Sequence, residues 1–580
     1  MKRIALLTIA IILPVMATQR VVVMEDFTAT WCTYCPGAAR GAEELKFRAF
    51  DSVVVIAYHS SSSDPFYTAT AASRASYYGI SGYPTMRIDG GYSIVGGMHY
   101  GTMYPTYRSY FESRKTQSSP FAIRLDVSYD STSRNGTLTI VVKNTSSASV
   151  SAQLHTALIE SHIYYPWQGL DSLHDVERTM LPNASGEAIT VNPGDSIIRT
   201  RNFTINTNWV AKNCELVVFI QDNSTRWIHQ GAMTAVIPIP ALEFAGYQPV
   251  LPAPGGSYDL TVGLRNIGSA PAAGASANLV TGDPYITITS ANTTFDTIPV
   301  GEDVFANSPF TIQVDSFCPD PHQAELQMVI TTSDLRVDTV VFPLNITATP
   351  GFADDMESGE NGWTHRGIRD YWHRSTYRSV SPTNSWYCGN EAGHQYINEQ
   401  DARLHTPFFT VGESSWVRFW QYYATEYNYD FCLVEINNGS PFWQELASFT
   451  GSSGTWELVN LDLSPFYGQS VQIRFRFISD YNQLDEGWYI DNFAAGIPLS
   501  LTETDAVAVK PRPWATVIRT RLILPETPGV QQTAAATLID ASGRKVLDLN
   551  SGVNDISRLP PGVYFLRRNP KGRDRIVVVR

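Results

Sequence analysis

The sequence has few cysteines and, beyond its first residues, no long apolar segment, and both shortages limit what the protein can be. Six cysteines in 580 residues are too few to support a disulfide-stapled extracellular scaffold, so its domains must rely on ordinary hydrophobic cores. No later stretch offers the roughly 18 uninterrupted apolar residues that a membrane-spanning helix needs. Charged residues are only 17% of the chain and the net charge is -13, which gives no reason to expect a nucleic-acid partner.

The motifs of several enzyme classes are also missing. The sequence contains no His-Glu-x-x-His, no Gly-x-Ser-x-Gly, no Walker phosphate loop and no dinucleotide-binding glycine fingerprint. A hydrolase is therefore disfavoured.

The N-terminus predicts export. Lys2 and Arg3 precede an apolar run over residues 4–15, which leads into Val15-Met16-Ala17. This pattern is typical of a secretory signal peptide, residues 1–17, cut after Ala17, and its apolar run is too short to span a membrane. No cysteine lies at the cut, so we expect no lipid anchor and no transmembrane segment after signal cleavage.

Two of the six cysteines are spaced for chemistry. Residues 31–36 read Trp-Cys-Thr-Tyr-Cys-Pro, between an apolar strand over 21–27 and a helical pattern over 38–50. At a strand-to-helix junction, the amides and positive end of the helix dipole favour a thiolate on Cys32. Cys35, one turn into the helix, is then the expected resolving thiol.

The following residues alternate between strand and helix signals. Residues 53–58 are β-branched, residues 68–78 form an alanine-rich helical pattern closed by Gly79, and an Asp-Gly-Gly hairpin joins strands over 85–88 and 92–95. Aromatic residues from Tyr107 to Phe111 mark a closing helix. The predicted order is strand, helix, strand, helix, strand, strand, helix.

This order, the cysteine pair and the string Tyr-Gly-Ile-Ser-Gly-Tyr-Pro-Thr over residues 78–85 resemble a thioredoxin fold. The resemblance implies that Tyr83–Pro84 is a cis peptide facing the disulfide, with neighbouring backbone that pairs with an extended substrate chain. Asp26 matches the buried acid that thioredoxins use as a proton relay. Thr33 and Tyr34 replace the usual Gly-Pro, and these positions help set the reduction potential.

The cysteine pair has other possible roles. Two cysteines alone cannot hold zinc, but an exported CxxC can be a permanently closed structural disulfide. His59 is expected near the cysteines and could tune their acidity, although an ordinary loop histidine is the favoured interpretation.

From residue 119 onward, alternating strands and polar turns replace the helical patterns. The predicted fold class is thus an N-terminal α/β thioredoxin fold followed by an all-β array of Ig-like sandwiches, a jelly roll and a small C-terminal β-sandwich. The predicted domains are 18–118, thioredoxin-like; 119–237, β-sandwich; 238–349, Ig/CARDB-like sandwich; 350–497, MAM-like jelly roll; and 498–580, C-terminal sorting domain. Residues 18–237 together resemble the 28 kDa outer-membrane-protein-like family of bacterial surface proteins.

Histidines and carboxylates gather over residues 160–178 and suggest a metal site. Their spacing matches no recognised ligand pattern, so a hydrogen-bonded loop is favoured.

The segment 350–497 carries eight tryptophans, which is typical of a jelly-roll core, although an exposed tryptophan could stack on a surface glycan. Its two ends resemble those of MAM-like jelly rolls, where the first and last strands are adjacent and carboxylates can share Ca²⁺. Glu357 and Asp491 are the candidate ligands, with simple turn residues as the alternative. Cys388 and Cys432 lie in this segment and can pair, whereas Cys214 and Cys318 lie in different domains and can be free.

The C-terminal residues resemble the sorting domain of type IX secretion cargo, through an Asp-x-Ser-Gly-Arg turn over 540–544 and a Pro-Gly-Val-Tyr strand over 561–564. Arg512-Pro513-Trp514 departs from the family's Asn-Pro-Phe element. The resemblance implies recognition by that secretion machinery, export across inner and outer membranes, and a secreted or cell-surface protein.

These observations lead to two hypotheses. The first is a cell-surface thiol-disulfide oxidoreductase that acts on protein disulfides or dithiols through Cys32 and Cys35. The second is a non-enzymatic surface or adhesion protein, in which the thioredoxin-like domain is a binding module and the CxxC a structural disulfide.

Overall fold

The computed structural model describes residues 18–333 and 336–498, and in the C-terminal region residues 516–518, 521–524, 536–540, 544–549, 552–555, 562–568 and 572–578. The chain divides into two compact units, residues 1–506 and 507–580. The predicted signal peptide and its cut after Ala17 lie outside the described residues. Among the helices that are described, none is long and apolar enough to cross a membrane.

The N-terminal segment has the element order that the sequence predicts. The elements are β1 Val22–Thr28, α1 Cys35–Ala49, β2 Val53–His59, α2 Ala69–Tyr78, β3 Thr85–Ile88, β4 Tyr92–Val95 and α3 Tyr104–Lys115. Strands β1 and β2 are parallel, β3 is antiparallel to β1, and β4 is antiparallel to β3. β1 and β2 read as continuous apolar runs because both are buried along their whole length.

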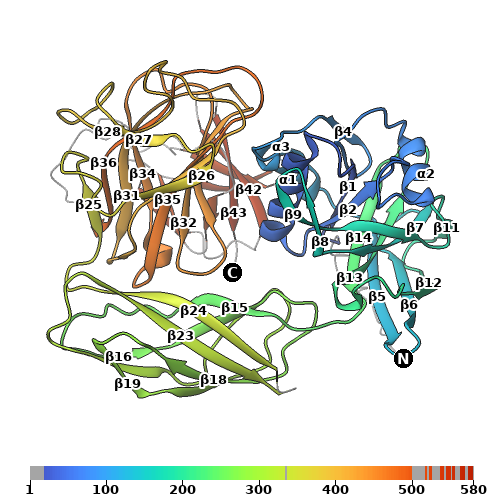
Figure 1. The fold of residues 1–580 in the computed structure, drawn as a ribbon, viewed down its shortest axis with the longest axis horizontal. Helices are drawn as coiled ribbons and strands as arrows, with labels where there is room; N and C mark the ends of the chain where they lie inside the picture. The colour runs from blue at the N-terminus through green and yellow to red at the C-terminus, as the bar shows by residue number, and fades with distance from the viewer. Residues whose placement is uncertain are drawn as a thin grey trace, which may run out of the picture. The chain divides into compact units, whose positions relative to one another are not determined.

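Local signals explain where the helices begin and end. The Thr68 hydroxyl accepts a hydrogen bond from the amide of Ala71 and caps the start of α2, and Gly79 ends that helix at a φ of +69°. Helices α1 and α3 pack on one face of the sheet, with Leu45 and Phe111 in the core (Figure 1). Helix α2 contributes Ala71 to a second core, on the other face.

The sheet continues beyond the N-terminal segment. Strand β10 pairs in parallel with β2, Val176 beside Ala57, so the strand order is β14-β13-β7-β10-β2-β1-β3-β4, with β11 on β7. A separate sheet, β12-β6-β5, packs its apolar face on β7 and β13. The strands are β5 Phe121–Asp130, β6 Asn135–Asn144, β7 Val150–Glu160, β8 Ile163–Trp167, β9 Leu170–Leu173, β10 Val176–Met180, β11 Glu187–Val191, β12 Ser196–Thr204, β13 Cys214–Gln221 and β14 Ile228–Ala235.

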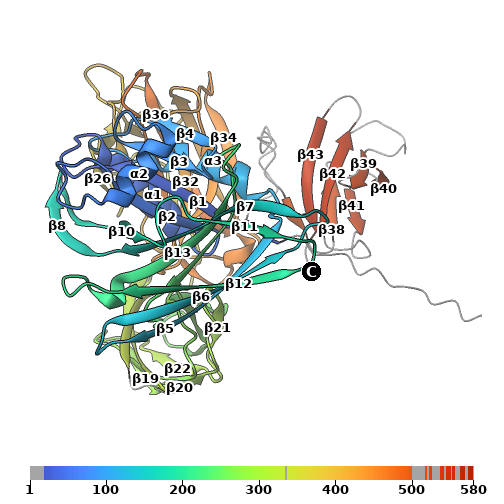
Figure 2. The same ribbon diagram turned by 90° about the vertical axis from the view of Figure 1, so that its right-hand side faces the viewer.

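The shared sheet changes how the first two predicted domains are understood. The proposed boundary between residues 118 and 119 falls after α3, yet five strands from beyond it, β7, β10, β11, β13 and β14, belong to the same sheet as β1 and β2. These two regions therefore form one continuous β structure (Figures 1 and 2).

Residues 242–346 form three small antiparallel sheets around one apolar core. The sheet orders are β15-β17-β21, β16-β22-β19 and β20-β18-β23-β24. The strands are β15 Leu242–Tyr247, β16 Ser257–Leu260, β17 Val262–Asn266, β18 Ala275–Val280, β19 Ile286–Ser290, β20 Asn292–Phe295, β21 Asp303–Phe305, β22 Phe310–Val314, β23 His322–Thr332 and β24 Val337–Ile346.

Residues 352–498 form two antiparallel sheets around an aromatic core. One sheet has the order β27-β28-β36-β31-β34, with β25 on β36, and the other β26-β29-β35-β32-β33, with β30 on β35. The strands are β25 Phe352–Asp354, β26 Thr364–Ile368, β27 Trp372–Ser375, β28 Ser385–Cys388, β29 Asp401–His405, β30 Phe409–Thr410, β31 Ser415–Ala424, β32 Phe431–Asn437, β33 Gln444–Phe449, β34 Glu457–Asp462, β35 Ser470–Ile478 and β36 Gly487–Pro498. The first and last strands, β25 and β36, are paired as predicted.

The C-terminal unit contains the sheet β37-β43-β42-β39-β40 and the pair β38-β41 (Figure 2). Its strands are β37 Thr516–Ile518, β38 Arg521–Leu524, β39 Ala536–Asp540, β40 Lys545–Leu549, β41 Gly552–Asp555, β42 Gly562–Arg568 and β43 Gly572–Val578. Arg512-Pro513-Trp514 and the centre of the 540–544 turn lie outside the described residues. The predicted fold class, an α/β domain followed by an all-β array, is confirmed.

Candidate functional site around the cysteine pair

Cys32 and Cys35 form a disulfide at the junction of β1 and α1. The Cys32 amide donates to the Ala29 carbonyl at 3.1 Å, which closes the turn after β1. Cys35 is the first residue of α1, with Pro36 in the first turn, where a missing N–H costs nothing. The sequence interpretation placed Cys35 one turn into the helix, whereas the helix begins at Cys35 itself.

The disulfide is nearly closed off from solvent. Cys32 is 6% exposed and Cys35 is fully buried, whereas the neighbouring side chains of Trp31 and Tyr34 are about half exposed, at 50% and 54%. Exposed aromatic side chains thus flank a covered disulfide.

Pro84 lies beside the cysteine turn. The Tyr83–Pro84 peptide is cis, and the Tyr83 ring meets the edge of Trp31 at a centroid distance of 5.8 Å. A Cβ at Gly97 would come within 2.3 Å of the Tyr34 carbonyl oxygen and 2.7 Å of the Pro84 ring. The glycine lets the two loops approach closely.

Asp26 of β1 is buried, at 3% exposed. It lines a cavity of about 120 Å³ together with Thr28 of the same strand and residues of α1 and β2. Its Oδ1 has no hydrogen-bond partner, and burial raises its pKa to about 7. A carboxyl group that titrates near neutral pH can take up or release a proton during exchange chemistry.

His59 is not a loop residue, which corrects the favoured sequence interpretation. It ends β2, is 1% exposed and lines the same cavity. Its Nδ1 lies 3.1 Å from Asp64 Oδ1, and Asp64 Oδ2 accepts from the amide of Thr30 at 2.6 Å. Burial alone would raise the pKa of Asp64, but hydrogen bonds from His59, Thr30 and Phe66 lower it to about 2.

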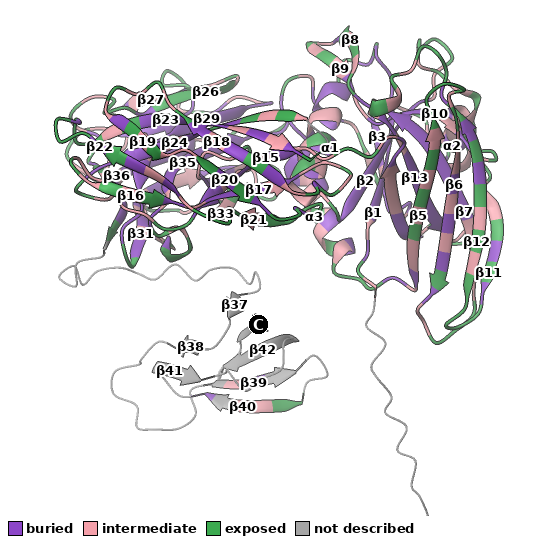
Figure 3. Cartoon of the chain, turned by 90° about the horizontal axis from the view of Figure 1, so that it is seen from below, coloured by how far each residue is buried: buried purple, intermediate pink, exposed green. Residues whose placement is uncertain are grey.

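A hairpin that sequence reasoning missed covers the disulfide. Strands β8 and β9 form a separate two-stranded sheet, and Figure 3 shows it apart from the strands of the main sheet. Trp167 and Leu173 of this hairpin pack in one apolar cluster with Cys32 and Cys35. The aromatic run over 163–167 followed by the Gln168-Gly169 turn could have indicated a hairpin. No local pattern, however, shows on which part of the protein a hairpin packs.

The segment 160–178 contains no metal site within the part of the chain that the structure describes. Glu160 instead pairs with Arg178 at 2.6 Å and accepts a hydrogen bond from the amide of Val210. These hydrogen bonds agree with the favoured interpretation of a hydrogen-bonded segment. The segment is not a loop, however, because it forms the β8–β9 hairpin and strand β10.

Glu357 and Asp491 lie on either side of the loop 380–384. Glu357 accepts from the amides of Thr383 and Asn384, and hydrogen bonds from these two residues lower its pKa to about 2. Asp491 accepts from the amide of Ser381 at 3.0 Å. The loop therefore bridges the two carboxylates.

Half of the tryptophans of this region belong to the core. Of the eight in residues 350–497, four are at most 2% exposed, and the other four are half-buried: Trp363, Trp372, Trp386 and Trp488, then Trp416, Trp420, Trp443 and Trp456. The half-buried Trp420 lines a surface hollow, and the more exposed rings are tyrosines such as Tyr427 and Tyr429. The expected Cys388–Cys432 pair is not bonded, and both are buried free thiols, as are Cys214 and Cys318.

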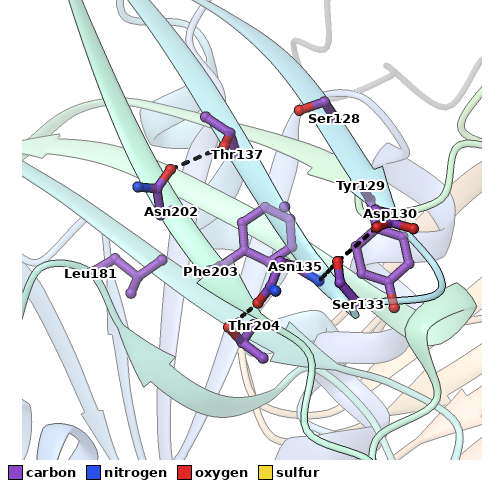
Figure 4. A pocket seen from close by; sticks show the side chains of 11 residues that line it. Ser128, Tyr129, Asp130, Ser133, Asn135, Thr137, Leu181, Asn202, Phe203 and Thr204 are labelled. Atoms are coloured by element: carbon purple, nitrogen blue, oxygen red, sulfur yellow. Dashed lines mark hydrogen bonds between the residues drawn. The ribbon is translucent and has the colours of Figure 1, made fainter.

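A larger hollow of about 720 Å³ opens at one end of the β5–β6–β12 sheet (Figure 4). Its polar side chains bond to one another: Thr137 donates to Asn202 at 3.0 Å and Thr204 to Asn135 at 2.6 Å. We assign it no chemistry.

Part of the chain is similar to known proteins. Residues 71–237 match the family model described as Outer membrane protein Omp28, a range that excludes Cys32 and Cys35. Bacillopeptidase F of Bacillus subtilis (strain 168) is 26% identical over 169 residues, which are 28% of this chain. The chain spans only 12% of the length of that curated relative.

Two solved structures from Porphyromonas gingivalis are similar in part. HBP35 matches with a TM-score of 0.32 and 14% identity, over 57% of this chain and 99% of its own. The K1 cleaved adhesin domain of Lys-gingipain from strain W83 matches with a TM-score of 0.20 and 16% identity, over 25% of this chain and 98% of its own. By the match of residues 71–237 to the outer membrane protein model, the chain is a secreted or cell-surface protein.

Proposed function

We propose that this protein is a cell-surface thiol-disulfide exchange protein of thioredoxin-like architecture. The observation that carries the proposal is the position of the Cys32–Cys35 disulfide, at the start of α1, beside the cis-Pro84 loop and on the same α1 side of the sheet as the Asp26 cavity. A structural staple needs neither a neighbouring acid with a pKa near 7 nor an adjacent cis-proline loop.

The exchange balances in two steps. A substrate thiolate attacks Cys32 Sγ, the Cys32–Cys35 bond breaks, and Cys35 leaves as a thiolate that takes a proton, for which Asp26 is the proposed donor. The second substrate thiolate then attacks the substrate sulfur of the mixed disulfide and releases the Cys32 thiolate. The substrate loses two electrons and becomes a disulfide, and the protein pair is reduced; the reverse sequence reduces a substrate.

We expect Cys32→Ser to abolish reduction of a protein disulfide such as insulin, and Cys35→Ser to accumulate mixed disulfides, because only the second variant keeps the attacking thiol. Turnover and mass spectra of the mature chain measure both. Cys318→Ala, which removes a buried thiol far along the chain, is the control and should keep full turnover. A wild-type reduction potential below about -300 mV without turnover would make the pair a structural disulfide.

We also propose that the C-terminal unit directs export through type IX secretion machinery. The support is the sequence resemblance of its turn and strand motifs, together with β39, β42 and β43, which form one sheet. Removing residues 507–580 should leave the protein inside the cell, which fractionation and surface labelling would test.

A second proposal is that Glu357 and Asp491 bind a structural Ca²⁺. The Ser381 hydroxyl lies 2.9 Å from Asp491 Oδ1, 3.3 Å from Glu357 Oε1 and 3.1 Å from the Asp355 carbonyl. One hydroxyl proton cannot satisfy three acceptors, and carboxylate, carbonyl and hydroxyl oxygens are the ligands that Ca²⁺ prefers. The bound ion would hold the loop 380–384 against β36.

We therefore expect a calcium chelator to lower the melting temperature of the mature protein, and added Ca²⁺ to restore it. Glu357→Gln should remove this calcium response. Calorimetry in the two buffers measures the effect. Equal melting curves with and without chelator would leave Glu357 and Asp491 as turn residues.

A further inference from the structure

The β8–β9 hairpin packs over the disulfide, in the place that a polypeptide substrate would have to occupy. Along β8, Trp167 is buried and Ile163 and Tyr165 are half-buried against the cysteine cluster, while Tyr164 between them is 81% exposed. Alternate residues of a strand point to opposite sides, so one apolar face of the hairpin lies on Cys32 and Cys35. The outer face is exposed to solvent.

Apart from this apolar face, the hairpin has few attachments to the rest of the protein beyond its base. Strands β8 and β9 pair with each other and not with the main sheet, and an isolated two-stranded hairpin is marginally stable. Its tip is the tight turn Gln168-Gly169, in which both residues have positive φ, 44° and 85°. The Gln168 side chain donates to the Trp31 carbonyl at 3.4 Å, a long hydrogen bond.

The base, in contrast, is fixed on both sides. The Asp175 carbonyl accepts from the Ala57 amide of β2 at 2.7 Å, and the Ser161 amide donates to the Asn213 carbonyl at 2.9 Å. His162, next to β8, and Asp175, two residues after β9, have φ of 55° and 56°, a conformation that few non-glycine residues adopt. Both ends of the hairpin are thus anchored, while its two strands take no part in the main sheet.

We propose that the β8–β9 hairpin is a displaceable cover on the Cys32–Cys35 site, and that the substrate which replaces it is an extended polypeptide segment with apolar side chains. The inference rests on the proposed function. Cys32 is 6% exposed, so an attacking thiolate reaches it only when the hairpin moves. The surface then uncovered includes Phe66, Tyr83 and Ala29, which suit apolar side chains better than charged ones.

The cover is tested with a small reductant, because dithiothreitol reduces any accessible disulfide whether or not the protein is an enzyme. Its two thiols become a disulfide as Cys32 and Cys35 become thiols. We expect Trp167→Ala to raise the rate constant of this reduction by about tenfold or more, since removing a large apolar contact favours the open hairpin. Tyr164→Ala, on the outer face of the same strand, should leave the rate within about twofold of wild type.

Leu170→Ser at the hairpin tip is a second variant, used where Trp167→Ala lowers the melting temperature of the whole protein; it should also accelerate reduction. Equal rates for wild type and a folded inner-face variant would overturn the cover.

The substrate class is tested with the Cys35→Ser variant and two peptides, each with its cysteine activated as a thionitrobenzoate disulfide. Cys32 attacks the peptide sulfur and thionitrobenzoate leaves, which absorbance follows. A peptide with Leu and Tyr beside the cysteine should react faster than one with Glu and Lys, and hydrogen exchange at residues 163–173 should rise in the product. Equal rates for the two peptides would refute the apolar substrate. If Trp167→Ala accelerates reduction by dithiothreitol but the protein turns over no protein disulfide, the proposed function is refuted and the cover is not.

Discussion

Replacing Asp26 by Asn is expected to stabilise the protein by about 4 kcal/mol at pH 8 and to leave its stability nearly unchanged at pH 3. The pKa of Asp26 in the folded protein is about 7, because burial disfavours the carboxylate, against about 3.9 in an unfolded chain. The difference of roughly 3 pKa units corresponds to about 4 kcal/mol. Asn removes the ionisation and keeps the shape.

The sign follows from proton binding. Below about pH 4 both states of the protein are protonated at Asp26, so the wild type has its full stability. Between about pH 4 and 7 the unfolded chain has lost this proton and the folded protein has kept it, so wild-type stability falls as pH rises. Above about pH 7 the penalty is constant.

Urea denaturation of both proteins at several pH values measures the difference. Asp126→Asn is the control, because the Asp126 side chain is 57% exposed on β5, and it should change stability by less than about 0.5 kcal/mol at any of these pH values. A stabilisation by Asp26→Asn that is the same at pH 3 and pH 8 would contradict the buried ionisation.

Replacing Arg74 by Met is expected to cost about 3–5 kcal/mol of stability, because it leaves the buried Glu25 carboxylate without its charge partner. Arg74 and Glu25 are 1% and 0% exposed and lie 2.6 Å apart. Tyr78 donates to the other Glu25 oxygen at 2.6 Å, and Arg74 also donates to Gln221 at 3.1 Å. The network ties α2 and β1 to β13, across the predicted domain boundary.

Chemical denaturation of wild type and variant measures the loss. The double variant Glu25→Gln with Arg74→Met should recover a large part of it, since no unpaired charge then remains buried. Arg124→Met, at a side chain that is 72% exposed, should be nearly neutral. A loss from Arg74→Met no larger than that from Arg124→Met would mean that the pair does not hold these elements together.

The elements that the sequence predicted well depend on neighbours within the same segment. The turn Asp89-Gly90-Gly91 lies between β3 and β4, and Thr68 and Gly79 limit α2, because turn and cap residues act on adjacent backbone. The cysteine pair at a strand-to-helix junction was predicted for the same reason. Spacing and periodicity are local quantities, and a sequence displays them directly.

The interpretations that failed depend on distant partners. His59 was taken as an ordinary loop residue, but it lines a cavity together with His174 and Asp175, which lie beyond the predicted domain boundary. Residues 160–178 became a cover on the disulfide because the strands around them join the N-terminal sheet. Cys388 and Cys432 share a core and are not bonded, which depends on how two sheets pack.

By itself, the sequence determined the order of elements around Cys32 and Cys35 and the change from an α/β segment to an all-β array, since hydrophobic period, caps and turns are written in consecutive residues. Only the tertiary structure decided that the sheet continues past residue 118, that Asp26 and His59 share a cavity and that the β8–β9 hairpin lies on the disulfide. The extended sheet and the position of the hairpin arise from contacts between residues about a hundred or more positions apart, such as Ala57 and Val176, and the cavity arises from the pairing of β1 with β2; no local pattern specifies either.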